Sequence, residues 1–181
     1  MAIPLTNVIR NFSDISDNYT TVICDLWGCL HNGVESFPKA LTALKDFRDA
    51  NGKVVLVTNA PRPIKNIEYQ IANLGIKDTH YDMLLTSGEL TSDYINKICE
   101  NNLNIFHIGG KRHHSIYKDM IHEKKITMEL ENIEDADLIV CTEPFNPLSD
   151  QLSDYENILK AGIDKELDLL CANPGFGSRC G

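Results

Sequence analysis

The chain has 181 residues, a formal net charge of −9 and a sequence pI near 5.0. This length suffices for one substantial core, or for one core plus a smaller unit. The negative charge argues against nucleic acid as a main partner, because phosphate backbones are bound by clustered lysine and arginine. No apolar run reaches membrane-spanning length, so we expect no membrane partner either.

The first residues and the cysteines predict a cytoplasmic protein. Residues 1–12 lack the charged start and the long apolar stretch of a secretory signal. The cysteines follow no C-x-x-C spacing and several fall in expected strands, which is typical of reduced, buried thiols. They predict neither a zinc site nor disulfides, and they are Cys24, Cys29, Cys99, Cys141, Cys171 and Cys180.

The first half of the chain alternates between strand and helix patterns. Apolar, β-branched runs predict buried strands, and three-residue steps such as Leu41, Leu44 and Phe47 predict one side of a helix. Proline near a helix start and Asn51-Gly52 after a helix end support these boundaries. The expected strands are 21–24, 53–57 and 83–86, and the expected helices are 38–50, 61 or 63 to 74, and 89–101.

The alternation continues in the second half. The expected strands are 104–108, 136–141 and 167–172, with a turn at Gly109-Gly110 and helices at 115–123 and 153–161. This order of elements predicts an α/β fold with parallel sheets and right-handed crossovers. Segment 175–181 is rich in glycine and has no apolar periodicity, so we expect a disordered tail there.

Asp25 is the first candidate for chemistry. It follows strand 21–24 and opens a polar segment that contains Gly28 and Gly33, which is typical of a loop. A carboxylate at the carboxyl end of a strand lies where open α/β sheets bind their ligands, and it suits a nucleophile or a metal ligand. Taken singly, an aspartate in such a place is more commonly a loop or capping residue.

Thr58-Asn59 is the second candidate. A hydroxyl and backbone N–H groups at the end of a strand, next to a helix start, form an anion site. Because neighbouring parallel strands end at the same edge, we expect Asp25 and Thr58 side by side, with Gly28 letting the loop turn tightly beside the anion. Alone, Thr58-Asn59 fits a helix N-cap equally well, and Arg62 fits either a phosphate contact or an exposed helix start. The two strand ends together favour a shared phosphate site.

These residues resemble the haloacid dehalogenase (HAD) superfamily of phosphohydrolases. Asp25 with its preceding strand resembles the first motif of that family, and the stretch 54–63 with Thr58 resembles the second. Thr58-Asn59, the helix and then residues 84–89 (LLTSGE) are similar to class IIA, the NagD-type or nitrophenyl-phosphatase group. The resemblance implies a partial HAD-like core at 1–86 and an incomplete α/β cap at 87–174.

The resemblance also implies roles for single residues. Asp25 would be the nucleophile and a Mg²⁺ ligand, and the backbone carbonyl of Trp27 would be the second ligand. Thr58 and Asn59 would bind the phosphate of a phosphorylated small molecule, beside Gly28 and Arg62.

Departures from the family pattern predict impaired turnover. Trp27 stands where the family has an aspartate that protonates the leaving group, and loss of a general acid costs roughly 10²–10⁴ in rate. Gly175 stands where the family has an aspartate after Asn-Pro. The family's late lysine motif and its Gly-Asp-x-x-x-x-Asp metal motif have no match, so we expect a C-terminally truncated architecture.

Two functions therefore stay open. The leading one is a Mg²⁺-dependent phosphate monoester hydrolase that acts through an aspartyl phosphate and is impaired in this chain. The alternative is a non-catalytic phosphate-binding or regulatory remnant that retains a phosphate pocket or pairs with another subunit, and a homo-oligomer stays open. A dinucleotide-binding domain is disfavoured, because no G-x-G-x-x-G follows the first strand.

Several weaker sequence features have a structural interpretation as well as a functional one. His31 and Asn32 could reach substrate, but such residues more often cap turns. The run Gly109-Gly110-Lys111-Arg112 could cradle an anion, although a two-glycine turn is weak evidence. His113 and His114 are adjacent, so on a helix they diverge by about 100° and do not converge on one ion.

Overall fold

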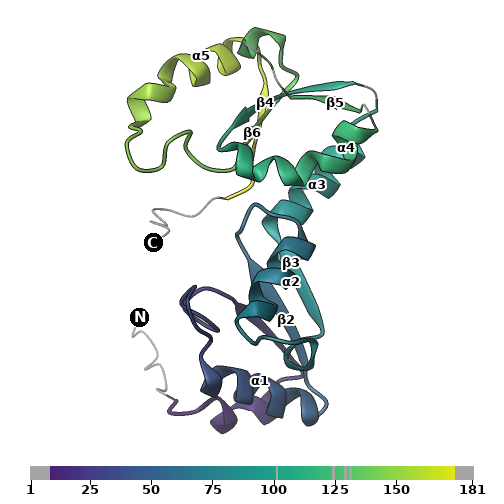
Figure 1. The fold of residues 1–181 in the computed structure, drawn as a ribbon, viewed down its shortest axis with the longest axis vertical. Helices are drawn as coiled ribbons and strands as arrows, with labels where there is room; N and C mark the ends of the chain where they lie inside the picture. The colour runs from purple at the N-terminus through teal and green to yellow at the C-terminus, as the bar shows by residue number, and fades with distance from the viewer. Residues whose placement is uncertain (1–8, 101, 124, 129, 131, 174–181) are drawn as a thin grey trace, which may run out of the picture. The chain divides into compact units, whose positions relative to one another are not determined.

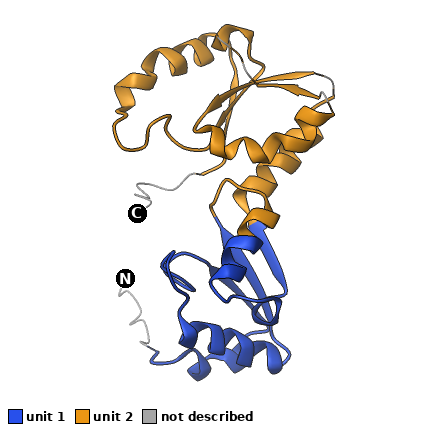
Figure 2. Ribbon diagram, viewed as in Figure 1, with its two compact units in different colours: residues 1–58, 68–85 blue, residues 59–67, 86–181 orange. Residues whose placement is uncertain are grey.

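The structure is a computed structural model that describes residues 9–173 except 101, 124, 129 and 131. The chain divides into two compact units, which Figure 2 shows in two colours: residues 1–58 with 68–85, and residues 59–67 with 86–181. Both units combine helices with parallel strand pairs, so the expected α/β fold is confirmed. The expected tail at 175–181 lies outside the described residues, and the domain limits 1–86 and 87–174 stay predictions.

The first unit is built on a three-stranded sheet in the order β1-β2-β3 (Figure 1). Its elements are β1 (Thr21–Asp25), β2 (Lys53–Thr58), β3 (Met83–Thr86, which ends at the boundary of the unit), α1 (Pro38–Asp49), η1 (Phe12–Asp14), η2 (Ser16–Asn18) and η3 (Asp78–His80); α2 (Ile64–Asn73) begins in the second unit.

The core of the first unit lies between α1 and β2. Leu41, Leu44 and Phe47 recur on one side of α1 and are buried, and Val54 and Leu56 of β2 are fully inaccessible. The expected helix end is also present, since Asn51 adopts a left-handed φ of 67° directly after α1.

β1 differs from the expectation of a buried strand. Its residues alternate between exposed and half-buried, and the Ile23 side chain is 71% exposed. The physical reason is position: β1 is an outer strand of the sheet formed by the described residues, so no strand flanks its other edge, and the face that carries Ile23 is left uncovered. A β-branched run alone does not distinguish a half-covered strand from a fully covered one.

Asp82 holds the start of β3 against β2. The Val54 N–H donates to Asp82 Oδ2 at 2.8 Å, and the Asp82 N–H donates to the Val54 carbonyl at 2.8 Å. Arg48 and Lys53 also donate to this carboxylate. The Val54 hydrogen bond and the two cations lower the pKa of Asp82 to about 2.

The second unit contains a four-stranded sheet in the order β5-β4-β6-β7. All three strand pairs are parallel. Its elements are α3 (Ser87–Ile98), β4 (Leu103–Ile108), η4 (Lys111–Tyr117), α4 (Lys118–His122), β5 (Ile126–Thr127), η5 (Ile133–Asp135), β6 (Leu138–Cys141), η6 (Leu152–Tyr155), α5 (Glu156–Asp164) and β7 (Asp168–Cys171).

Alternation along β6 gives this sheet two packed faces. Leu138 and Val140 pack with Ile105 and with side chains of α3, η4 and α4. Ile139 on the opposite face packs with η5 and α5. Helices therefore cover both faces, as expected of a parallel sheet (Figure 1).

The short elements were harder to predict. The expected helix at 115–123 is a 3₁₀ helix from Lys111 followed by the five-residue α4, and β5 has only two residues. Such short segments span only about one or two periods of hydrophobicity, so the sequence pattern does not define them.

Ile105 tests the core of the second unit. Its side chain is fully inaccessible in β4, so Ile105→Ala removes buried methyl groups and leaves a cavity. We expect a loss of about 2–5 kcal/mol in the free energy of unfolding, measured by urea denaturation with circular dichroism. The control is Leu169→Ala in β7, where the side chain is 46% exposed and the loss should be much smaller. Equal losses would contradict this placement of the core.

Candidate functional site

The two candidate strand ends are neighbours in the first unit. β1 and β2 pair in parallel, with Asp25 opposite Val57, so Thr58 lies one position further along β2. The expectation that Asp25 and Thr58 share one edge of the sheet is therefore confirmed. This is the carboxyl edge, where parallel sheets bind ligands.

The Asp25 carboxylate is exposed and held by its own loop. The backbone N–H of Leu26 donates to Asp25 Oδ1 at 2.7 Å. Leu26 and Leu30 are only 3% and 1% exposed, so both ends of the following turn are buried. The Leu30 N–H donates to the Leu26 carbonyl at 2.9 Å and closes that turn. The loop thus presents the carboxylate from a fixed backbone.

Two glycines allow this loop its shape. Gly28 has a φ of +76°, and its N–H donates to the His31 carbonyl at 2.8 Å. Gly33 has a φ of +89°, and a Cβ there would lie 2.5 Å from the Trp27 ring. Both positions are in the left-handed region that favours glycine, and the second also lacks room for a side chain.

His31 and Asn32 hold the loop together. His31 is 3% exposed, and its Nδ1 accepts from the Gly33 N–H at 3.0 Å. Burial lowers the pKa of His31, and the nearby Asp25 charge partly opposes that shift. Asn32 Oδ1 accepts from the N–H groups of Val34 and Glu35. These contacts favour the turn-capping interpretation for both side chains.

Trp27 places a large aromatic ring where the family pattern has a proton-donating aspartate. Its ring is 56% exposed and meets the His31 ring edge-on, with the ring centroids 5.7 Å apart. An indole has no acidic proton for a leaving group. It also has no oxygen to offer a metal ion, so within Trp27 only the backbone carbonyl suits the predicted role as a metal ligand.

Asn59 and Arg62 belong to segment 59–67 of the second unit, which continues directly from Thr58. Asn59 Nδ2 donates to Asn173 Oδ1 at 2.8 Å, and the Ser87 hydroxyl donates to the Asn59 carbonyl at 2.8 Å. The Thr86 hydroxyl donates to the Arg62 carbonyl at 2.7 Å. The predicted phosphate segment therefore has a fixed backbone.

The start of α2 excludes one alternative for Thr58-Asn59. The helix begins only at Ile64, whose N–H donates to Glu89 Oε2 at 3.0 Å. Glu89 therefore satisfies the first turn of α2, and Thr58 and Asn59 lie too early in the chain to act as its N-cap. The sequence pattern does not indicate this contact, because it joins residues 25 positions apart.

Gly88 lets α3 pack closely against the backbone of Arg62 in segment 59–67. A Cβ at Gly88 would lie 2.1 Å from the backbone nitrogen of Arg62. Because backbone atoms cannot move aside cheaply, only glycine fits this position in α3.

Glu143 is a residue that sequence reasoning missed. It follows β6, and its carboxylate accepts from Arg112 Nε at 2.9 Å and from the Gly110 N–H at 3.3 Å. The turn that could have cradled an external anion is therefore bound to the chain's own carboxylate. Burial raises the pKa of Glu143, but Arg112 and His113 outweigh it, and the net shift is downward. The available signal was its position two residues beyond the end of β6.

His113 connects this carboxylate to the predicted phosphate segment. Its side chain is 7% exposed, with Nε2 3.0 Å from Glu143 Oε1. Its Nδ1 lies 3.2 Å from the carbonyl of Pro61. Because a carbonyl oxygen only accepts, Nδ1 carries a proton. His113 and Glu143 thus anchor Pro61, which lies between Asn59 and Arg62 in the chain.

Comparisons with known proteins agree with this geometry. A family model of haloacid dehalogenase-like hydrolases matches residues 22–121, which include both strand ends and the segment after them. The chain belongs to the haloacid dehalogenase-like hydrolase family. The expected resemblance is confirmed. Comparison with curated protein sequences finds no significant match.

Solved structures of the same family support the fold. A haloacid dehalogenase-like hydrolase from Brucella suis 1330 is 35% identical, with a TM-score of 0.74 over 90% of this chain and 59% of that chain. A 4-nitrophenylphosphatase from Thermotoga maritima is 21% identical, with a TM-score of 0.60 over 89% of this chain and 57% of that chain. The NagD protein of E. coli K-12 is 21% identical, with a TM-score of 0.56 over 89% of this chain and 59% of that one. The chain thus spans less than two thirds of each.

The family implies a divalent cation, and the chain offers part of a donor set for it. Among the described residues, no group of three His, Cys, Asp or Glu side chains converges as a metal site. Mg²⁺ is commonly held by one or two carboxylates, several waters and substrate oxygens. The Asp25 carboxylate and the Trp27 carbonyl are oxygen donors of the right kind, so they fit the ion as a partial set.

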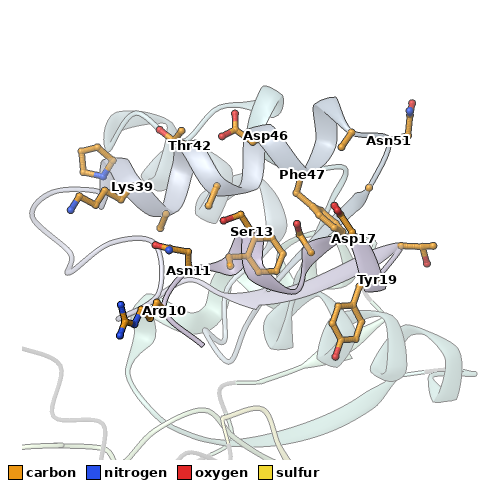
Figure 3. Close-up of a pocket in the computed structure, with 18 residues that line it drawn as sticks. Arg10, Asn11, Ser13, Asp17, Tyr19, Lys39, Thr42, Asp46, Phe47 and Asn51 are labelled. Carbon is orange, nitrogen blue, oxygen red and sulfur yellow. The ribbon is translucent and has the colours of Figure 1, made fainter. Parts of the chain in front are cut away.

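A groove lies away from this edge, between η1, η2 and α1 (Figure 3). It has a volume of about 1150 Å³ and includes Thr20 and Gly52, which directly precede β1 and β2. It is therefore at the amino ends of the strands, and it contains none of the candidate residues.

No helix within the described ranges is long and apolar enough to cross a membrane.

His107 belongs to a cluster of aromatic rings in which Tyr117 is buried and His107 and His114 are half-buried. Its ring contacts those of His114 and Tyr117, at centroid distances of 4.9 and 5.6 Å, and Nε2 lies 2.9 Å from the Thr142 hydroxyl. Burial lowers the pKa of His107 to about 4, and the neighbouring His114 and His113 act in the same direction. The folded state therefore holds this imidazole neutral.

This shift predicts a pH dependence of stability. Between pH 6.5 and about 4 the unfolded chain binds more protons at His107 than the folded chain does, so acid destabilises the fold over that window. We expect the free energy of unfolding to fall less between pH 7 and about 4.5 in His107→Gln than in the wild type. Urea denaturation at each pH measures it, with the exposed His122→Gln as the control. Parallel curves for wild type and His107→Gln would contradict the assignment.

Proposed function

We propose that the carboxyl edge of β1 and β2 binds a phosphate monoester and that Asp25 accepts its phosphoryl group. The observation that carries this proposal is the parallel pairing of the two strands, with Asp25 opposite Val57 and Thr58 next along. A carboxylate and a hydroxyl at neighbouring strand ends lie at the edge where such sheets bind anionic ligands.

The proposed roles follow from the chemistry of each group. Asp25 and the Trp27 carbonyl would hold Mg²⁺, which supplies positive charge to the phosphoryl oxygens. The Thr58 hydroxyl and the backbone and amide of Asn59 would donate to those oxygens. Gly28 would let the phosphate approach the backbone, because it has no side chain, and Arg62 would add a positive charge. Membership of the family supports this division of roles.

The reaction on Asp25 would proceed in two steps. A carboxylate oxygen of Asp25 forms a bond to phosphorus as the ester oxygen leaves, and water then hydrolyses the aspartyl phosphate. The departing oxygen must take its proton from water, because the Trp27 indole has none to give. Loss of a general acid costs roughly 10²–10⁴ in rate, so we propose slow turnover and a preference for good leaving groups.

The proposed substrate is a phosphorylated small molecule. The relatives include a glycerol phosphate phosphatase of Mycobacterium tuberculosis solved with magnesium, of which the chain covers 48% at 19% identity. A 4-nitrophenyl ester suits the present chain best as a probe, because its leaving group needs no protonation. A cytoplasmic location and a homo-oligomer stay predictions.

Asp25→Asn tests the nucleophile. We expect hydrolysis of p-nitrophenyl phosphate with Mg²⁺ to fall by at least about 10³-fold, because an amide cannot form the acyl phosphate. Release of nitrophenolate measures the rate. The matched control is Asp46→Asn on the exposed side of α1, which should leave the rate unchanged. Equal rates for wild type and Asp25→Asn would remove Asp25 from the mechanism.

A second candidate function is phosphate binding without turnover. Trp27 favours it, since an exposed indole stands at the sequence position of the family's acid. In that case inorganic phosphate with Mg²⁺ would raise the melting temperature of wild type but not of Thr58→Val, which keeps the shape and loses the hydroxyl. Thr42→Val on α1 is the matched control. Stabilisation without turnover supports this function, whereas no stabilisation in any variant contradicts both proposals.

A further inference from the structure

Four consecutive carbonyl groups in segment 59–67 accept hydrogen bonds from other residues of the second unit. Three of the donors belong to the N-cap and the first turn of α3, and the fourth is His113 of η4. The donor and acceptor pairs are Ser87 with Asn59, Gly88 with Ala60, His113 with Pro61 and Thr86 with Arg62. Each bond fixes the direction of one peptide group, so together they fix the path of the segment.

Pro61 has a single backbone group that can form a hydrogen bond. A proline has no N–H, so only its carbonyl can anchor its backbone. Pro61 is buried, and its carbonyl oxygen lies 3.2 Å from His113 Nδ1. A buried carbonyl that loses its donor is unfavourable, and a shift of the segment toward water relieves that cost. The position of Pro61 therefore depends on His113.

The imidazole of His113 is held in place from its other side. Nε2 lies 3.0 Å from Glu143 Oε1 and 3.2 Å from Arg112 Nε. Arg112 Nε also donates to Glu143 Oε1 at 2.9 Å. Nδ1 carries a proton whichever of these two groups Nε2 pairs with, because the Pro61 carbonyl only accepts. Glu143 and Arg112 therefore fix the ring, and the ring fixes Pro61.

We propose that His113 is a positioning residue for phosphate binding, through which the second unit sets the affinity for phosphate. This inference rests on the proposed function, in which Asn59 and Arg62 bind the phosphate. Pro61 lies between these two residues in the chain, so a shift of Pro61 displaces both of them. Asp25 belongs to β1 of the first unit, so the loss of His113 leaves the nucleophile in place. His113 therefore acts on binding and not on the chemical step.

Amide hydrogen exchange, followed by NMR on the whole chain, tests the contact without any ligand. His113→Gln extends its amide to the position of Nε2, whereas His113→Asn keeps an N–H donor at the position of Nδ1. The reporters are the N–H groups of Arg62 and Gly88, which both donate to the Ala60 carbonyl next to Pro61. We expect them to exchange about 2–10-fold faster in His113→Gln, the equivalent of one neutral hydrogen bond, and close to the wild-type rate in His113→Asn.

Two controls separate this local effect from a general loss of stability. Exchange at Arg62 and Gly88 is compared with exchange at Val140, which is fully inaccessible in β6, because general destabilisation accelerates all three. His122→Asn changes an exposed histidine of α4 and should leave both reporters unchanged.

Binding and kinetics test the positioning role. We expect His113→Gln to raise the Kd of inorganic phosphate with Mg²⁺, and the KM of p-nitrophenyl phosphate, by about 2–10-fold while kcat stays unchanged. His113→Asn should restore most of the affinity. A purely structural role would lower the melting temperature and leave the Kd of the folded protein unchanged.

Glu143→Gln is the second variant, in case His113→Gln does not fold. It keeps the shape of the side chain and removes the charge that holds the imidazole. We expect exchange and Kd to change in the same direction as in His113→Gln, by a smaller factor.

Unchanged exchange at Arg62 and Gly88 in both His113→Gln and Glu143→Gln would overturn the proposal. Faster exchange with an unchanged Kd for phosphate would overturn it as well. A wild-type chain that binds no phosphate contradicts the proposed function and this role with it, whatever the exchange rates. Wild-type binding with an equal Kd in His113→Gln contradicts this inference alone.

Discussion

The parallel pairing of β1 with β2 is the constraint on which the candidate site depends. Its register fixes where each strand ends, and with it the positions of Asp25 and Thr58. A slip by one residue would turn each side chain to the opposite face of the sheet. On its other side β2 is held by Asp82, whose carboxylate binds the Val54 N–H, Arg48 and Lys53.

The second unit shows how a polypeptide can satisfy its own anion site. The Gly109-Gly110 turn presents a backbone N–H beside Arg112, and Glu143 supplies the carboxylate that these donors bind. The same carboxylate interacts with His113, which reaches the carbonyl of Pro61. An electrostatic cluster that looks like a binding site in the sequence is therefore a structural support for the backbone between Asn59 and Arg62.

Elements that repeat their hydrophobic period several times were predictable from the sequence, and so was the shared edge of Asp25 and Thr58. The exposure of Ile23 was not, because burial depends on what lies beside β1 and not on the strand's own residues. The Glu89 contact with Ile64 and the role of Glu143 were also missed. Both join residues about 25 to 31 positions apart, and a single sequence contains no pattern for such pairs.

Trp27 is the one tryptophan of the chain, and it stands in the loop that follows the candidate nucleophile. Its half-exposed indole contacts His31 and covers Gly33, so its emission depends on the conformation of that loop and on the proximity of the imidazole. Fluorescence excited at the indole band therefore reports on a single known place in the first unit. The protein carries an intrinsic optical probe in the loop after the proposed nucleophile, and no label has to be attached to follow that loop.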